Sequence, residues 1–106
     1  MNNNMIYLTT DKYLHQYIYG KRHQVKGSWV ATPTLKDPNV VHIGWSLCNK
    51  KDKYDKLRGF NIAFGRAYKG STDRVPYSLK LGFYFFKKRC HRYFKDKKIN
   101  IGYHEE

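Results

Sequence analysis

The stretch that decides the fold is VHIGWSLCNKKDKYDKLRGFNIAFGRA, residues 41–67. It begins with an alternation in which Val41, Ile43 and Trp45 are separated by small or polar residues, and this alternation predicts a strand. A charged segment follows, and then apolar residues recur at helical spacing. This second pattern predicts an amphipathic helix over about 53–68. We therefore expect a strand that leads into a surface helix at the centre of the fold.

The start of this helix is marked by acidic residues. Asp52 occupies an N-cap position and Asp55 follows three residues later. Negative side chains are favourable there, because the N-terminal end of the helix dipole is positive. Gly59 and Gly65 each lower the stability of the helix by about 1 kcal/mol relative to alanine. We therefore expect that another element packs closely at both positions and leaves no room for a side chain. The residues expected on the buried side are Leu57, Phe60, Phe64, Ala67 and Tyr68.

Further strands are predicted before this helix. Residues 28–32 and 40–48 are rich in Val, Ile and Trp, and the intervening PTLKDPN has turn-forming residues, which together predict a β-hairpin. We expect Trp45 to face the core and His42 to face solvent. Residues 5–9 resemble a short strand. Thr10 and Asp11 then predict a brief helix carrying Leu14, Tyr17 and Ile18, with a strand around 17–19 as the alternative.

A last helix is predicted over residues 76–95. Pro76 suits its first turn, and its apolar stripe continues to residue 94, which favours a helix over the alternative strand at 77–86. The stripe comprises Leu79, Phe83, Phe86, Cys90, Tyr93 and Phe94. The sequence thus predicts an α+β fold, a small antiparallel sheet packed against two amphipathic helices. Residues 1–106 are expected to form a single domain, with 1–4 and about 102–106 loose.

Composition limits the partners. The chain has 21 Lys and Arg against 8 Asp and Glu, a formal net charge of +13, yet 41% of its residues are hydrophobic. That apolar content argues against disorder, and the charge favours an anionic partner: nucleic acid, an acidic protein surface or anionic lipid. The sequence contains neither a signal-peptide pattern nor an apolar run long enough to span a membrane. We therefore expect a cytoplasmic protein, and among these partners we expect nucleic acid or an acidic protein surface rather than a membrane.

Motifs for catalysis and metal binding are absent from the sequence. Residues 40–67 contain neither a Walker motif nor a dinucleotide fingerprint, although the basic loop before Asp52 remains a weaker phosphate-binding candidate. Neither Cys48 with His42 nor Cys90 with His91 has the ligand spacing that zinc favours. We expect no catalytic residues, no metal and no cofactor. Both cysteines are expected to be buried, reduced thiols.

Basic residues provide the strongest functional signal. Eight of them converge on the last helix and its exit: Lys80, Lys87, Lys88, Arg89, Arg92, Lys95, Lys97 and Lys98. Tyr84, His91 and Tyr93 lie among them, a mixture suited to pairing phosphates and stacking on bases. The predicted binding residues are Lys50, Lys51, Lys53, Lys80, Tyr84, Lys87, Lys88, His91, Arg92 and Lys95.

Residues 40–95 also carry a family resemblance. The motifs are a G-W-S-L-C strand, a D-K-aromatic helix start, a G-x-x-I-A-x-G-R-A helix, Pro76-Tyr77-Ser78 and the basic ending RCHRYFK. In these motifs the chain resembles a group of small, mostly uncharacterised proteins encoded by tailed bacteriophages. The resemblance implies a setting, the cytoplasm of an infected bacterial host, and a role in host takeover or counter-defence.

Two functions are predicted from the same residues. The first is non-enzymatic binding of nucleic acid or a nucleoprotein complex through the last helix and the cluster at 50–56. The alternative is a protein inhibitor that docks on an acidic or nucleic-acid-binding surface of a host defence or transcription enzyme. An enzyme is the third possibility, with a nuclease as its most plausible form.

Overall fold

A computed structural model describes residues 12–48, 53–70 and 74–100. The predicted strand at 5–9, its following cap residues, the loop residues Lys50 and Lys51, and the two ends predicted to be loose lie outside these ranges. The described chain forms four strands and two α-helices, which confirms the predicted α+β class. In chain order the elements are β1 (Leu14–Tyr19), η1 (Lys21–His23), β2 (Val25–Pro33), β3 (Val40–Leu47), α2 (Lys56–Lys69), η2 (Tyr77–Leu79), α3 (Lys80–Tyr93) and β4 (Lys98–Asn100).

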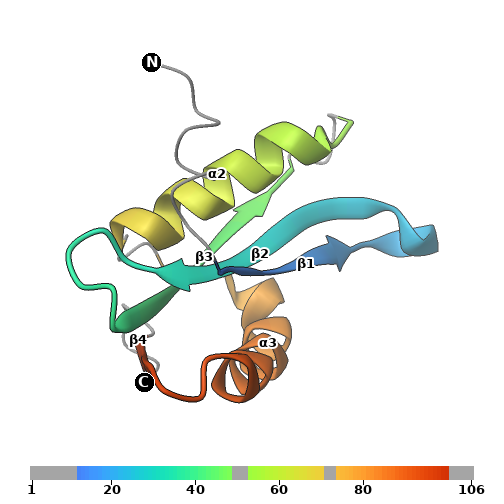
Figure 1. Cartoon of the computed structure of the whole chain (residues 1–106). Coiled ribbons are helices and arrows are strands. Elements are labelled where there is room, and N and C mark those ends of the chain that lie inside the picture. The colour runs from blue at the N-terminus through green and yellow to red at the C-terminus, as the bar shows by residue number, and fades with distance from the viewer. Residues whose placement is uncertain (1–11, 49–52, 71–73, 101–106) are drawn as a thin grey trace.

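The sheet lies between the two helices, with α2 over one face and α3 over the other (Figure 1). Because side chains alternate along a strand, Trp29 and Ile43 face α3 while Val30 faces α2. His42 lies on the α2 side as well and is only 2% exposed. The prediction that His42 faces solvent is therefore wrong, because a helix covers the face that was expected to be open.

The strands are adjacent in the order β1-β2-β3-β4. β2 and β3 form the predicted antiparallel hairpin, with Trp29 opposite Trp45. In the turn between them, Asp37 Oδ1 accepts a hydrogen bond of 3.0 Å from the Asn39 amide. β4 pairs in parallel with the first residues of β3, so the sheet is mostly rather than wholly antiparallel. The sequence did not predict this fourth strand.

The first described element is a strand, and the predicted brief helix is wrong. β1 pairs antiparallel with β2, with Leu14 opposite Ala31 and Tyr17 opposite Ser28. Leu14 and Ile18 pack in the core on the α3 side, and Tyr17 projects to the other face. Pairing with β2 therefore overrides three apolar residues at helical spacing, and the alternative of a strand at 17–19 is confirmed.

Helix α2 confirms the second predicted element, with a later start. Its N-cap is Asp55, whose side chain accepts a hydrogen bond of 3.0 Å from the Arg58 amide. The predicted N-cap, Asp52, lies outside the described residues. The helix ends at Gly70, whose φ of 69° places it in the left-handed conformation that glycine adopts without strain.

Small residues bring α2 against the sheet. Gly59, Ala63 and Ala67 are buried with Phe64, whereas Leu57 is 67% exposed, so the predicted buried stripe is wrong at Leu57. The separations of four residues place the three small ones on the same side of the helix. That side lies against the sheet, so its buried stripe is formed largely by small residues.

Gly44 and Gly59 have backbone or aromatic atoms where a side chain would be. A Cβ on Gly44 would lie 2.1 Å from the Ala63 carbonyl oxygen, and one on Gly59 would lie 1.8 Å from the Tyr54 hydroxyl. Gly65 has no such neighbour within 4 Å. The expected close packing is thus confirmed for Gly59 and wrong for Gly65.

Helix α3 covers the larger core. Its buried residues are Phe83, Phe86 and Cys90, preceded by Leu79 and followed by Phe94. Trp29 stacks on Phe86 with ring centroids 5.9 Å apart and planes inclined by 18°. The alternative strand at 77–86 is wrong. Tyr93 is 48% exposed and does not belong to the buried stripe, also contrary to prediction.

The rim of this core is formed by Trp45, which is half-buried rather than central. Arg66 of α2 lies with its guanidinium carbon 4.8 Å from the Trp45 ring centroid. Its Nη1 donates a hydrogen bond of 2.8 Å to the Trp45 carbonyl oxygen. Only the first residues of β3 pair with β4, and Trp45 lies beyond them. Its carbonyl oxygen accepts a hydrogen bond from Arg66 instead of from another strand.

The two cysteines have different environments. Both are reduced thiols, but Cys90 is fully buried and Cys48 is half-buried, so the expected burial is confirmed for Cys90 only. Burial raises the pKa of the Cys90 thiol to about 12, against a smaller opposing effect of the Arg89 charge. Cys90 is therefore an unreactive core residue.

No helix within the described ranges combines the length and apolar character of a membrane span.

We expect Gly44→Ala to destabilise the protein by about 1–3 kcal/mol, because the added methyl group would meet the α2 backbone. Gly65→Ala is the matched control. It has open space around its Cβ position and is expected to stabilise α2 by up to about 1 kcal/mol. Urea denaturation measures both. Equal stability of the two variants would contradict the close contact between α2 and β3.

Thiol labelling should distinguish the cysteines. A thiol reagent added to the native protein is expected to modify one cysteine per chain, and to reach the second only after unfolding. Replacing Cys48 by serine should remove the fast phase, whereas replacing Cys90 by alanine should retain it. Two fast-reacting thiols in the native protein would show that Cys90 is not held in the core.

Candidate nucleic-acid interface

The solvent-exposed side of α3 carries basic and aromatic side chains together. We define the outer face of α3 by eight exposed residues, Lys80, Leu81, Tyr84, Phe85, Lys88, His91, Arg92 and Lys95, the last lying just beyond the helix. They lie opposite the buried stripe on the helical wheel. Residues 80–95 contain no Asp or Glu, so no acidic side chain of this segment offsets the positive charge.

Most of the predicted binding residues on the last helix are brought together on this face. Lys80, Tyr84, Lys88, His91, Arg92 and Lys95 are all exposed. Lys87 is different: it is half-buried, and its Nζ lies 5.9 Å from the centroid of the Phe83 ring. Its aliphatic stem therefore packs against the core. Changing Lys87 would disturb packing as well as charge.

The second predicted basic cluster, at 50–56, does not join the first. Lys50 and Lys51 lie outside the described residues, and Lys53 is exposed ahead of α2. Lys56, the first residue of α2, lies with its Nζ 5.4 Å from the Tyr17 ring on the α2 side of the sheet. The sheet separates α2 from α3 (Figure 1), so this end of the cluster and the outer face of α3 point in opposite directions.

Exposed apolar residues on the outer face were not predicted. Leu81 is 68% exposed and Phe85 is 55% exposed, and Tyr77 in the preceding η2 turn is 88% exposed. In the sequence, Leu81 and Phe85 alternate with Leu79 and Phe83 at every second position, which is the pattern behind the alternative strand at 77–86. The signal that could have found them is the recurrence of positions 77, 81, 84, 85 and 88 at intervals of three or four residues.

A basic turn between β1 and β2 was also missed. Residues Lys21–His23 are exposed, and both Arg22 and His23 have positive φ angles, 58° and 59°. Two consecutive non-glycine residues in the left-handed region indicate a strained turn. The sequence offers no strong signal for it, because these residues lack the usual turn chemistry.

A hydrogen-bonded polar cluster lies between the sheet and α2. His15 Nε2 is 3.1 Å from Ser28 Oγ, which is 2.9 Å from the Tyr54 hydroxyl, and that hydroxyl is 3.2 Å from Ser46 Oγ. A histidine beside a serine resembles a base and its nucleophile. Ser28 is fully buried, however, so a substrate cannot reach its hydroxyl. The cluster instead ties three strands to the segment that leads into α2.

Burial lowers the pKa of His15 below its ordinary value. The imidazole packs against aromatic rings, with its centroid 4.6 Å from that of Tyr17 and 5.1 Å from that of Phe60. These surroundings disfavour the charged form. His15 is therefore a neutral hydrogen-bonding partner of Ser28 near pH 7.

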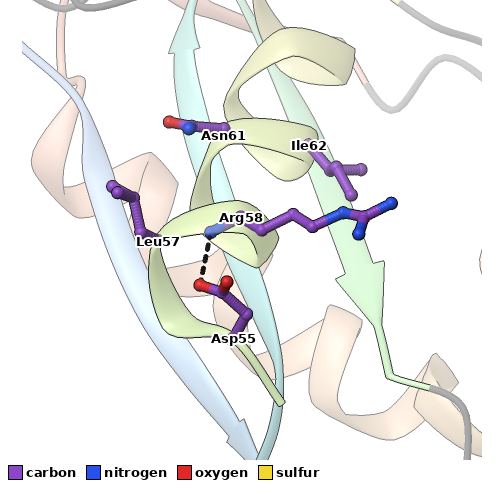
Figure 2. Close-up of a pocket in the computed structure, with 5 residues that line it drawn as sticks. All are labelled: Asp55, Leu57, Arg58, Asn61 and Ile62. Carbon is purple, nitrogen blue, oxygen red and sulfur yellow. Dashed lines mark hydrogen bonds between the residues drawn. The ribbon is translucent and has the colours of Figure 1, made fainter. Parts of the chain in front are cut away.

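The start of α2 also forms a shallow pocket, which is lined by Asp55, Leu57, Arg58, Asn61 and Ile62 (Figure 2). The Asp55 carboxylate is already used as the helix cap. The remaining side chains offer no acid–base pair for catalysis. Within residues 12–48, 53–70 and 74–100, no three His, Cys, Asp or Glu side chains gather as a metal site would require.

Comparisons with protein families, with curated proteins and with solved structures find no match to this chain. The bacteriophage resemblance therefore stays a prediction, and the outer face of α3 is the feature from which a function can be inferred.

We expect protonation of His15 to destabilise the fold. Because its pKa is lower in the folded state, the unfolded chain takes up the proton first as the pH falls below about 6.5, and stability is lost from there down to the folded pKa. Free energies of unfolding at about pH 7.5 and about pH 5 should differ less in His15→Gln than in the wild type. An equal loss in both proteins would exclude His15 as the source.

Proposed function

We propose that this protein binds nucleic acid through the outer face of α3 and acts by binding rather than by catalysis. The observation that carries the proposal is the exposure of Lys80, Lys88, Arg92 and Lys95 along a segment without acidic residues. Lysine and arginine on such a surface release counterions when they pair with phosphates. This electrostatic effect provides affinity without requiring a particular sequence.

The packing of α3 supports this function. Phe83, Phe86 and Cys90 hold the helix against the sheet, so its outer face is fixed before a ligand arrives. A rigid helix places successive cations at defined spacing, and less conformational entropy is lost on binding than with a flexible basic tail. A preformed surface also needs no folding step to bind.

The bacteriophage resemblance supplies the proposed setting. In the cytoplasm of an infected bacterium, a small basic protein of this kind would bind nucleic acid or a nucleoprotein complex during host takeover or counter-defence. The same basic face would also suit an acidic protein surface. The experiment must therefore distinguish nucleic-acid binding from the inhibitor function.

A salt titration tests the proposal. If roughly five phosphates are neutralised, a fourfold increase in salt should lower the affinity for random DNA or RNA several hundredfold. The variant Lys88→Gln, Arg92→Gln, Lys95→Gln should bind more weakly, and the slope of log affinity against log salt should fall by about three. Circular dichroism and melting should remain near wild type, because these residues lie outside the core.

A control variant with the same change in charge separates the local face from overall charge. Lys36→Gln, Arg58→Gln, Lys69→Gln removes exposed cations from α2 and from the turn between β2 and β3. It should bind more tightly than the α3 variant. Equal weakening by the two variants would reject the outer face of α3. No binding to DNA or RNA at low salt would overturn the proposal and leave docking on an acidic protein.

A further inference from the structure

Three aromatic rings near the start of α3 are exposed although the core does not require them. Tyr77 is 88%, Phe85 is 55% and Tyr84 is 47% exposed. The core on this side of the sheet is already filled by Phe83 and Phe86. A group of large exposed rings is informative, because such residues more often mark a binding surface than a structural need. We name Tyr77, Tyr84 and Phe85 the ring patch.

Cations lie directly beside two of these rings. Lys88 Nζ is 4.6 Å from the centroid of the Tyr84 ring, and Lys80 Nζ is 5.9 Å from that of Tyr77. Tyr84 and Phe85 contact each other, with centroids 5.5 Å apart and planes inclined by 67°. Their different orientations present ring surfaces in two directions. A ligand that reaches a ring therefore also meets a positive charge.

The rings and the cations belong to one continuous surface. Positions 81, 85, 88 and 92 recur at intervals of three or four, so they share one side of α3. Phe85 is thus followed along the helix by Lys88 and Arg92. A ligand lying along this side meets aromatic side chains first and basic side chains next. This arrangement suits a polymer that carries both flat apolar groups and repeated negative charges.

We propose that the outer face of α3 prefers single-stranded nucleic acid, with unpaired bases stacked on the ring patch and phosphates paired with Lys80, Lys88 and Arg92. This inference rests on the proposed function. In a duplex the bases are already stacked inside, so their faces cannot reach a ring. In a single strand they are free, and every base has a face that can stack.

The composition of the helix also argues against reading a duplex groove. Base edges in a groove are recognised chiefly through hydrogen bonds from residues such as arginine, asparagine and glutamine. Residues 80–88, the part of α3 that carries Leu81 and Phe85, contain none of these three residue types, and their apolar groups would lie against polar base edges. Aromatic stacking uses these same side chains favourably.

The test compares single-stranded and double-stranded forms of one mixed-sequence DNA of about 20 nucleotides, longer than a typical site of about 4–16. The wild type should bind the single strand more tightly at equal salt. Tyr84→Leu, Phe85→Leu, which keeps the side chains apolar, should weaken single-strand binding by about fivefold to a hundredfold per stacked ring. Duplex binding should change less than about twofold, because phosphate contacts remain.

Two controls accompany this variant. Tyr19→Leu removes a ring that is 56% exposed on β1, away from α3, and should leave binding of both forms unchanged. Polyglutamate supplies negative charge without bases and should bind wild type and ring variant equally. A ring variant that weakens both DNA forms, or polyglutamate, to the same extent would overturn the preference for unpaired bases.

The remaining outcomes separate the two proposals. If the wild type binds single strand and duplex equally, and only the lysine and arginine variant weakens them, the inference fails and the proposed function stands. If the wild type binds neither DNA nor the matching RNA at low salt, the proposed function fails and the inference fails with it.

Discussion

The close approach of α2 to β3 is the constraint on which the rest of the structure depends. At Gly44 no side chain separates the two backbones, and the facing positions of α2 are Ala63 and Ala67. A helix held this near the sheet covers the small and polar residues of that face. The larger apolar residues of β2 and β3 then project to the opposite face, where α3 covers them. α2 is thus held by close backbone contact and a small cluster that includes Val30 and Phe64, and α3 by a larger aromatic core.

Much of the fold could be predicted because its strongest patterns are local. The alternation in β3 and the periodicity of α3 extend over enough residues to identify each element. The prediction for Leu14, Tyr17 and Ile18 failed because pairing with β2, a non-local interaction, decides the conformation of β1. His42 was misplaced for a related reason: a strand pattern separates two faces but does not reveal that a helix covers each.

The sequence predicted the charges of the candidate site and one of its rings, Tyr84, but it missed Tyr77 and Phe85. The positions of Lys88 and Arg92 follow from helical geometry once the buried stripe is known. The same geometry places Phe85 off that stripe, but its exposure was missed because its apolar side chain also suited the alternative strand at 77–86. Lys87 was predicted to be a binding residue, but its long aliphatic stem packs near Phe83. The helical position alone does not reveal this contact. Such assignments require coordinates.

The contact between Arg66 and Trp45 has a consequence for self-association. β4 pairs only with Val40–His42, so within the described chain the later part of β3 forms an edge of the sheet. Sheet edges with open backbone groups are where chains join into aggregates. Arg66 occupies the Trp45 carbonyl and places a charge beside the ring, which opposes the docking of another strand. Helix α2, which packs closely on the sheet, thus also protects the open edge of β3 from aggregation.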